Sequence, residues 1–164
     1  MIETIGFILT GIGLTASIVY YANVLANANK TRKAQLFMSI YKETQTKEAQ
    51  TDFLDFAKIE MNNTEDWLKL QEDRKLWVIL AKQLSYYEGI GVLVREGLID
   101  IGLVARLSSG SILEFWGRFG DGCKELREFY NWPRWAIEVE YLSDQINAYS
   151  KKHPELKIKA SERL

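Results

Sequence analysis

The sequence predicts an all-α protein, in which one N-terminal transmembrane helix continues into a soluble, antiparallel helical bundle. Three observations predict this class. No charged side chain occurs from Thr4 to Asn29. Charged residues make up 26% of the chain, and its only two prolines, Pro133 and Pro154, lie late. After Asn29 the apolar residues recur at steps of three and four, which is the spacing of a helix.

The uncharged run is long enough to cross a bilayer. At 1.5 Å per residue it extends about 39 Å, and the hydrocarbon core is about 30 Å thick. A cleaved signal peptide is the alternative, since Ala26-Asn27-Ala28 resembles a cleavage site. The residues before the run, Met1-Ile2-Glu3, contain no Lys or Arg, which favours a retained anchor. We therefore expect an anchor over residues 1–29, a helical bundle over 30–152 and a polar tail over 153–164.

The charges that flank the run predict its orientation. Lys30, Arg32 and Lys33 follow it directly, and nothing basic precedes it except the amino terminus. The positive-inside rule places this cluster in the cytoplasm, in contact with lipid head groups. We expect a single-pass protein of the cell membrane, with its N-terminus outside and its domain cytoplasmic. The single cysteine agrees, because it allows no intramolecular disulfide.

Six helical segments are expected in order. The membrane helix continues to about Thr44, because Leu36, Phe37, Ile40 and Tyr41 form an apolar stripe. A short helix follows at about 49–61, and Asn62-Asn63-Thr64 breaks the chain. The longest soluble helix is expected over about 65–96. Its apolar seam becomes regular after Asp73 and ends at Gly97, a residue that suits a helix stop.

The second half of the bundle is expected to contain three helices. Asp100 can cap a short helix to Leu107, and a turn follows at Ser108-Ser109-Gly110. Ser111 and Glu114 form a capping box that opens a helix to about Tyr130. Trp132-Pro133 begins the last helix, and Pro154 ends it. The residues expected on its buried stripe are Trp135, Val139, Leu142, Ile146 and Tyr149.

The residues offer few groups for catalysis. The one histidine, His153, lies in the expected tail, and Cys123 is expected to be a plain, partly buried thiol. Gly120-Asp121-Gly122 lacks the spacing of a phosphate loop and is expected to mark a kink or close packing inside a helix. A Mg²⁺ site at Glu138, Glu140 and Asp144 remains open, although a solvated face is favoured. We expect no enzyme activity, no cofactor and no metal.

The balance of charges and the aromatic residues restrict the classes of molecule that the protein is expected to bind. The chain has 21 Lys and Arg and 22 Asp and Glu, and only Glu3 of these precedes Lys30. This balance gives no electrostatic footprint for nucleic acid. Five tryptophans could line a ligand pocket, but at helical spacing core and interface positions are favoured. These tryptophans are Trp67, Trp77, Trp116, Trp132 and Trp135.

Several short stretches resemble a known family. Residues 86–94, Tyr-Tyr-Glu-Gly-Ile-Gly-Val-Leu-Val, followed by Gly97-Leu98-Ile99-Asp100, are similar to the prokaryotic family called domain of unknown function 4760. Further similar pairs are Leu103-Val104, Phe115-Trp116, Leu126-Arg127 and Tyr141-Leu142. The resemblance covers about residues 30–149. It implies an N-terminal membrane helix followed by a helical domain, and it implies no activity.

Two classes of function remain. The favoured one is a non-enzymatic interaction module, an accessory or scaffold subunit of a membrane complex. Gly6, Thr10, Gly13 and Ser17 lie on one face of the anchor, where small residues allow close packing with another membrane helix or a second copy of the chain. The alternative is a ligand-binding sensor or a carboxylate-based enzyme, with its site inside the bundle.

One carboxylate is singled out by its place. Glu88 follows Tyr86-Tyr87 in the most apolar soluble helix and is either a functional acid or half of a structural ion pair. We expect the pair, with Arg127 or Arg118 as the partner, since a guanidinium binds a carboxylate with two hydrogen bonds.

Overall fold

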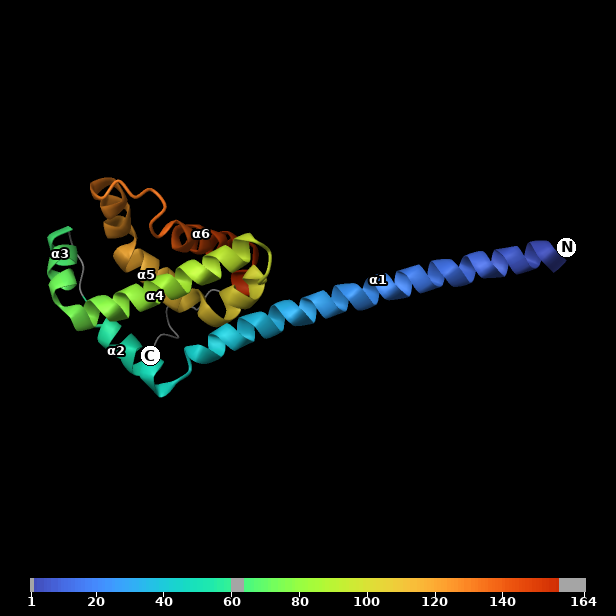
Figure 1. The fold of residues 1–164 in the computed structure, drawn as a ribbon, viewed down its shortest axis with the longest axis horizontal. Coiled ribbons are helices and arrows are strands. Elements are labelled where there is room, and N and C mark those ends of the chain that lie inside the picture. Colours follow the sequence, from blue (N-terminus) through green and yellow to red (C-terminus); the bar gives the residue numbers. More distant parts are fainter. Residues whose placement is uncertain (1, 60–63, 157–164) are drawn as a thin grey trace.

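The computed structural model describes the chain at residues 2–59 and 64–156. Helices are the only regular elements of this part, as predicted, and it contains no strand. Its elements are α1 (Ile2–Glu43), α2 (Lys47–Phe56), α3 (Thr64–Glu72), α4 (Arg74–Arg95), α5 (Ile101–Phe129), α6 (Ile137–Lys152) and the short 3-10 helix η1 (Pro154–Leu156). Figure 1 shows a bundle of α2–α6 from which α1 projects as a long, straight arm.

Helix α1 runs without a break from the uncharged run into the bundle, as expected, and ends at Glu43. Its C-terminal part packs against the other helices, because Phe37 is fully buried and Ile40 and Tyr41 are partly buried. The Thr44 hydroxyl closes the helix by donating to the Tyr41 carbonyl oxygen at 2.7 Å.

The transmembrane part of the prediction is not supported by the structure. Among the residues that the structure describes, no helix combines the length and the apolar composition that crossing a membrane requires. Thr15, Ser17 and Asn23 lie within the described part of α1 and lower its mean hydropathy.

The predicted single helix over 65–96 is wrong, since the structure divides it into α3 and α4 at Asp73. The Asp73 carboxylate accepts hydrogen bonds from the backbone N–H groups of Lys75, at 3.0 Å, and Leu76, at 3.1 Å. It thereby caps α4, as Asp commonly does at a helix start. The predicted stop at Gly97 is confirmed, since Gly97 has a φ of 65°.

The predicted turn at Ser108-Ser109-Gly110 is also wrong, because α5 continues through it. Val104, Ser108, Ile112 and Phe115 are all buried, so the core-facing stripe runs across the serines without interruption. The Ser111 hydroxyl donates to the Ser108 carbonyl oxygen at 3.1 Å and does not cap a new helix. Asp100 caps the whole of α5 by accepting from the Gly102 N–H at 2.8 Å.

The last helix begins later than predicted, at Ile137 and not at Trp132. Asn131 and Ala136 both have a positive φ, of 49° and 56°, so the backbone turns twice between α5 and α6. The helix ends before Pro154, as predicted. Val139, Leu142 and Ile146 of its expected stripe are fully buried, whereas Trp135 and Tyr149 are partly buried.

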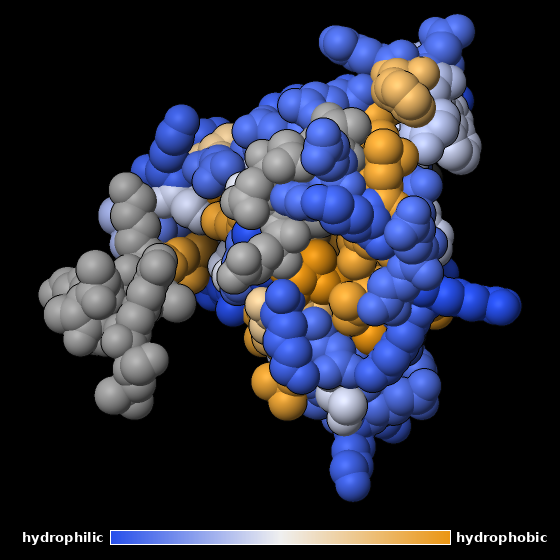
Figure 2. Space-filling view, turned by 90° about the vertical axis from the view of Figure 1, so that its left-hand side faces the viewer, coloured by the Kyte–Doolittle hydropathy of each residue, from blue (hydrophilic) through white to orange (hydrophobic). Residues whose placement is uncertain are grey.

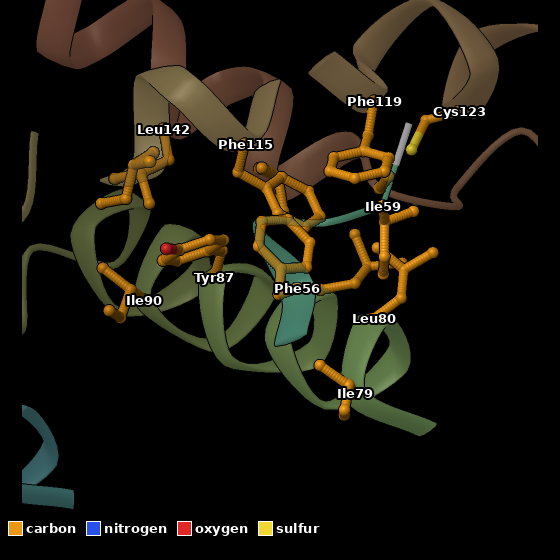
Figure 3. Packing of buried hydrophobic residues seen from close by; sticks show 14 of the residues in the cluster. Phe56, Ile59, Ile79, Leu80, Tyr87, Ile90, Phe115, Phe119, Cys123 and Leu142 are labelled. Carbon is orange, nitrogen blue, oxygen red and sulfur yellow. The ribbon is translucent and has the colours of Figure 1, made fainter. Parts of the chain in front are cut away.

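Aromatic rings fill the core between α2, α4 and α5. Phe115 lies with its ring centroid 5.6 Å from that of Phe56, 5.2 Å from Phe119 and 5.1 Å from Tyr87. Figure 3 shows these rings side by side, with Leu80 and Ile90 beneath them on α4. Such pairs contribute about 0.5–1.5 kcal/mol beyond the area that they bury.

The tryptophans mainly pack against the core, as favoured. Trp67 is 1% exposed and lies against α5 at Gly122, where a Cβ would overlap the indole ring. Of the two alternatives expected at Gly120-Asp121-Gly122, a kink or close packing, the structure shows close packing. Trp132 is different, with 60% of its surface exposed. Seen from the end of the bundle opposite to the arm, apolar residues show in the middle of a largely hydrophilic surface (Figure 2).

Candidate functional site

The outer part of α1 is the most unusual surface of the molecule. Every side chain from Gly11 to Lys33 is exposed, and these include Ile12, Leu14, Ile18 and Val19 at 55% or more. A soluble helix normally buries one apolar stripe against its own domain. This segment has apolar groups on every side and no part of the described chain covers them.

The predicted small-residue face lies on this arm. A Cβ on Gly6 or Gly13 would meet no atom within 4 Å, so the face is open to a neighbouring helix. The Ser17 hydroxyl donates to the Gly13 carbonyl oxygen at 2.8 Å, so this polar group is satisfied inside the helix. The Thr10 side chain lies outside the described part of the structure.

The basic cluster marks the boundary between the arm and the bundle. Lys30, Arg32 and Lys33 are exposed, and the next residue, Ala34, is the first that is partly covered. The bundle therefore begins directly after the cluster. This places the three cations between the apolar arm and the packed domain, as the sequence predicted.

Glu88 caps a helix. The prediction paired it with Arg127 or Arg118, and the structure gives it another partner. Its carboxylate accepts a hydrogen bond from the Glu138 N–H of α6 at 2.9 Å. Helix α6 has no cap of its own, because the residue at that position is Ala136. Burial raises the pKa of the Glu88 carboxyl, the hydrogen bond from Glu138 lowers it, and the nearby Arg127 charge also lowers it.

Both arginines hold backbone carbonyl groups in place. Arg127 forms an ion pair with Glu140 at 2.6 Å and donates to the carbonyl oxygens of Trp135, at 2.5 Å, and Ala136, at 3.0 Å. It thus ties the α5–α6 connection to the end of α5. Arg118 donates to the carbonyl oxygens of Ala57 and Ile59 and so anchors the end of α2.

The other candidate residues have structural surroundings. Glu138 forms an ion pair with Arg95 at 2.7 Å, Glu140 is paired with Arg127, and Asp144 is exposed. Cys123 is fully buried, and burial raises its pKa to about 12, so its thiol carries a proton at neutral pH. His153 is not simply solvated, because its ring stacks on Tyr149 with the centroids 4.2 Å apart.

The sequence analysis missed a cavity of about 240 Å³ where α1, α2, α4 and α5 meet. Aromatic, amide and hydroxyl side chains dominate its lining: Tyr41, Thr44, Gln45, Gln50, Phe53, Gln83, Tyr86, Tyr87, Ser108 and Ser111. Three charged residues, Glu43, Asp52 and Lys82, complete the polar part of its wall. Both Tyr86 and Tyr87 line it, but no local sequence motif marks a cavity that four helices form together.

The comparisons with known proteins find one family. A family model described as "Domain of unknown function (DUF4760)" matches residues 2–146, which extend from the start of α1 into α6. No curated protein and no solved structure matches the chain.

Proposed function

Because the chain belongs to the family described as domain of unknown function DUF4760, whose description names no activity, we propose a function from the geometry of the chain itself. The outer part of α1 inserts into a lipid bilayer and holds the helical bundle at the cytoplasmic surface of the cell membrane. There the protein acts as a non-enzymatic interaction module, an accessory or scaffold subunit of a membrane complex.

The exposed arm is the observation that carries this proposal. Burying apolar surface is favourable by about 25 cal/mol per Å², and the arm leaves Phe7 84% exposed and Leu25 64% exposed. A helix that is apolar all round is found in a core or in a membrane. Among the residues that the structure describes, no helix qualifies as a membrane span. The proposal therefore rests on the uncharged run from Thr4 to Asn29 together with the exposure of its apolar side chains.

Extraction of membranes at alkaline pH tests the insertion. The full chain is expected to stay in the membrane pellet. A double variant, Ile12→Arg with Ile18→Arg, is expected in the supernatant, because each arginine near the centre of a span costs about 3 kcal/mol. Leu54→Arg is the matched control, since Leu54 is 64% exposed on α2, outside the arm. Release of the unaltered chain would contradict the proposal.

A reporter at Leu164 tests the orientation. A reporter that works only in the cytoplasm is expected to be active there, because Lys30, Arg32 and Lys33 oppose translocation of the bundle. Changing all three to Gln is expected to weaken contact with anionic lipids by about 1 kcal/mol each without releasing the chain. Activity of a reporter that works only outside the cytoplasm would overturn the orientation.

The interaction part of the proposal rests on the small-residue face of the arm. Gly13→Leu places bulk where a neighbouring helix would approach closely. Ile12→Leu is the matched control, because it changes shape on another face of the same turn. Cross-linking in native membranes is expected to show an assembly that Gly13→Leu abolishes and Ile12→Leu retains. The same cross-linked species in both variants would remove this role.

A further inference from the structure

The cavity at the junction of α1, α2, α4 and α5 contains a buried hydroxyl group without a partner. Tyr86 Oη is buried and is the one side-chain polar atom of this kind among the described residues. Its neighbour Thr44 donates its own hydroxyl proton to the Tyr41 carbonyl oxygen and accepts from Gln45 Nε2 at 3.0 Å, so it has no proton left to donate to Tyr86. Buried hydroxyl groups are normally hydrogen-bonded, so an orphan beside a cavity needs an explanation.

The Tyr86 side chain lines the cavity, and its buried hydroxyl group can donate a hydrogen bond. Burial raises the pKa of Tyr86 to about 12, and the nearby Tyr87 hydroxyl raises it further. The Thr44 hydroxyl lies close enough to lower this pKa, but it does not form a hydrogen bond of normal geometry with Tyr86 Oη. The group therefore stays protonated at neutral pH and acts as a hydrogen-bond donor. What it lacks is an acceptor atom.

The charges around the cavity select against anions. Lys82 is the only cation in the lining, and its ammonium group is 2.7 Å from Asp52 Oδ2. Glu43 adds a second carboxylate without a further cation in the lining. An anionic ligand would meet a wall with a net negative charge, whereas a neutral ligand would not.

The size and the rings of the cavity indicate the shape of a ligand. Its volume of about 240 Å³ is below the roughly 300–1,000 Å³ that is typical of drug-sized ligands, so a compound of one or two rings fits. Tyr41, Phe53, Tyr86 and Tyr87 supply aromatic surface for stacking or edge contacts.

We propose that this cavity binds a small, uncharged aromatic compound that bears a carbonyl oxygen or ring nitrogen, and that this atom accepts the Tyr86 O–H. The ligand would contact Tyr41 and Thr44 at the end of α1 together with Tyr86 on α4. It would thus bridge the arm and the bundle at the point where they join. This inference goes beyond the interaction module and does not depend on insertion of the arm into a membrane.

Benzamide and benzoate are matched probes, because they share a ring and differ in charge. The full chain in lipid nanodiscs, labelled with ¹³C at tyrosine rings, is titrated with each probe. Benzamide is expected to shift a tyrosine signal and to saturate, and benzoate is expected to bind at least tenfold more weakly. Failure of benzamide to saturate, or equal affinity for both probes, would overturn the proposal.

Two tyrosine variants locate the binding. Tyr86→Phe is expected to weaken benzamide binding about tenfold, since a hydrogen bond contributes about that factor, whereas Tyr130→Phe, at an exposed residue outside the lining, leaves it unchanged. Equal affinity of Tyr86→Phe and the unaltered chain would overturn the proposal. In the absence of benzamide, Tyr86→Phe is expected to unfold at no lower temperature than the unaltered chain. A clear drop would show that the hydroxyl already has a partner and would also overturn it.

Discussion

Two phenylalanines of one helix have opposite surroundings. Phe7, near the start of α1, is 84% exposed, and Phe37, near its end, is 0% exposed. The two lie about 45 Å apart along the helix axis. Helical propensity alone does not distinguish them. The bundle covers α1 only from Ala34 onward, so one continuous helix belongs to two environments.

This difference separates two kinds of stability. The inner part of α1 is held by tertiary packing, since Phe37 lies in the same core cluster as Phe56, Leu84 and Ile112. The outer part is held by hydrogen bonds within the helix itself, those of its backbone and those of side chains such as Ser17 to the Gly13 carbonyl oxygen. An isolated helix is marginally stable in water. A bilayer supplies what the bundle does not, because its interior offers apolar contact on all sides and strengthens helical hydrogen bonding.

The largest expected effect tests the comparison directly. Phe37→Ala is expected to lower the free energy of unfolding of the bundle by about 3–5 kcal/mol, through lost burial and the cavity left behind. Phe7→Ala is expected to change it by less than about 0.5 kcal/mol. Chemical denaturation of the full chain in detergent micelles measures both. Similar losses for the two variants would show that the arm packs on the bundle after all.

Two glycines of α4 sharpen the comparison inside the bundle. A Cβ on Gly91 would overlap the Glu138 backbone carbonyl oxygen of α6, whereas a Cβ on Gly89 would meet nothing. Gly91→Ala is expected to cost about 3 kcal/mol, the upper part of the usual range for overpacking, because backbone atoms must move. Gly89→Ala is expected to gain about 0.5–1 kcal/mol of helix propensity. The same denaturation experiment distinguishes them, and a loss at both positions would contradict the close α4–α6 crossing.

The cap of α6 is expected to contribute less. Glu88→Ala leaves the Glu138 N–H without its acceptor and is expected to cost about 1–2 kcal/mol. Glu88→Gln retains an oxygen that can accept the same hydrogen bond, so its cost is expected to be below about 1 kcal/mol. Equal costs for the two substitutions in thermal or chemical unfolding would show that charge, and not the cap, is what matters.

The pH dependence of this cap is the smallest expected effect. The pKa of Glu88 is raised above the ordinary 4.5 in the folded protein, so the folded state holds this proton more tightly than the unfolded chain does. The free energy of unfolding then falls as pH rises from 4.5 through the raised value. Glu88→Gln removes this titration. The stability of this variant relative to the unaltered chain is therefore expected to improve between about pH 4 and about pH 7, and a difference independent of pH would contradict the raised value.

The sequence was sufficient for the all-α class, although not for the transmembrane helix that was part of that prediction. It was also sufficient for the continuity of α1 and for most of the buried positions. It failed where a tertiary contact overrode a local signal. Ser108-Ser109-Gly110 reads as a turn, yet the buried stripe of α5 passes through it. The break at Asp73 was missed for a different reason. The sequence carried a signal for it, since the apolar seam becomes regular only after Asp73 and Asp favours helix starts, but the prediction extended one helix across this residue.

The candidate sites were harder to predict for the same reason. Glu88 was identified correctly as a carboxylate in an apolar setting, but its partner is the N–H of Glu138 at the start of α6. The start of α6 was expected five residues too early, at Trp132. The prediction therefore placed Glu138 inside the helix, where its backbone N–H would already have a partner. The cavity arises where four helices meet, and no local motif records such a meeting.

Depth measurement with spin labels tests the central claim most directly, namely that the outer part of α1 lies in lipid. Labels are attached at Ile18→Cys and at Met38→Cys, while the native Cys123 remains buried and protonated. In lipid nanodiscs, dissolved oxygen is expected to reach the label at residue 18 better than an aqueous nickel chelate does. The order should reverse at residue 38, which is half exposed beyond the basic cluster. Free access of the nickel chelate to both positions would contradict the account.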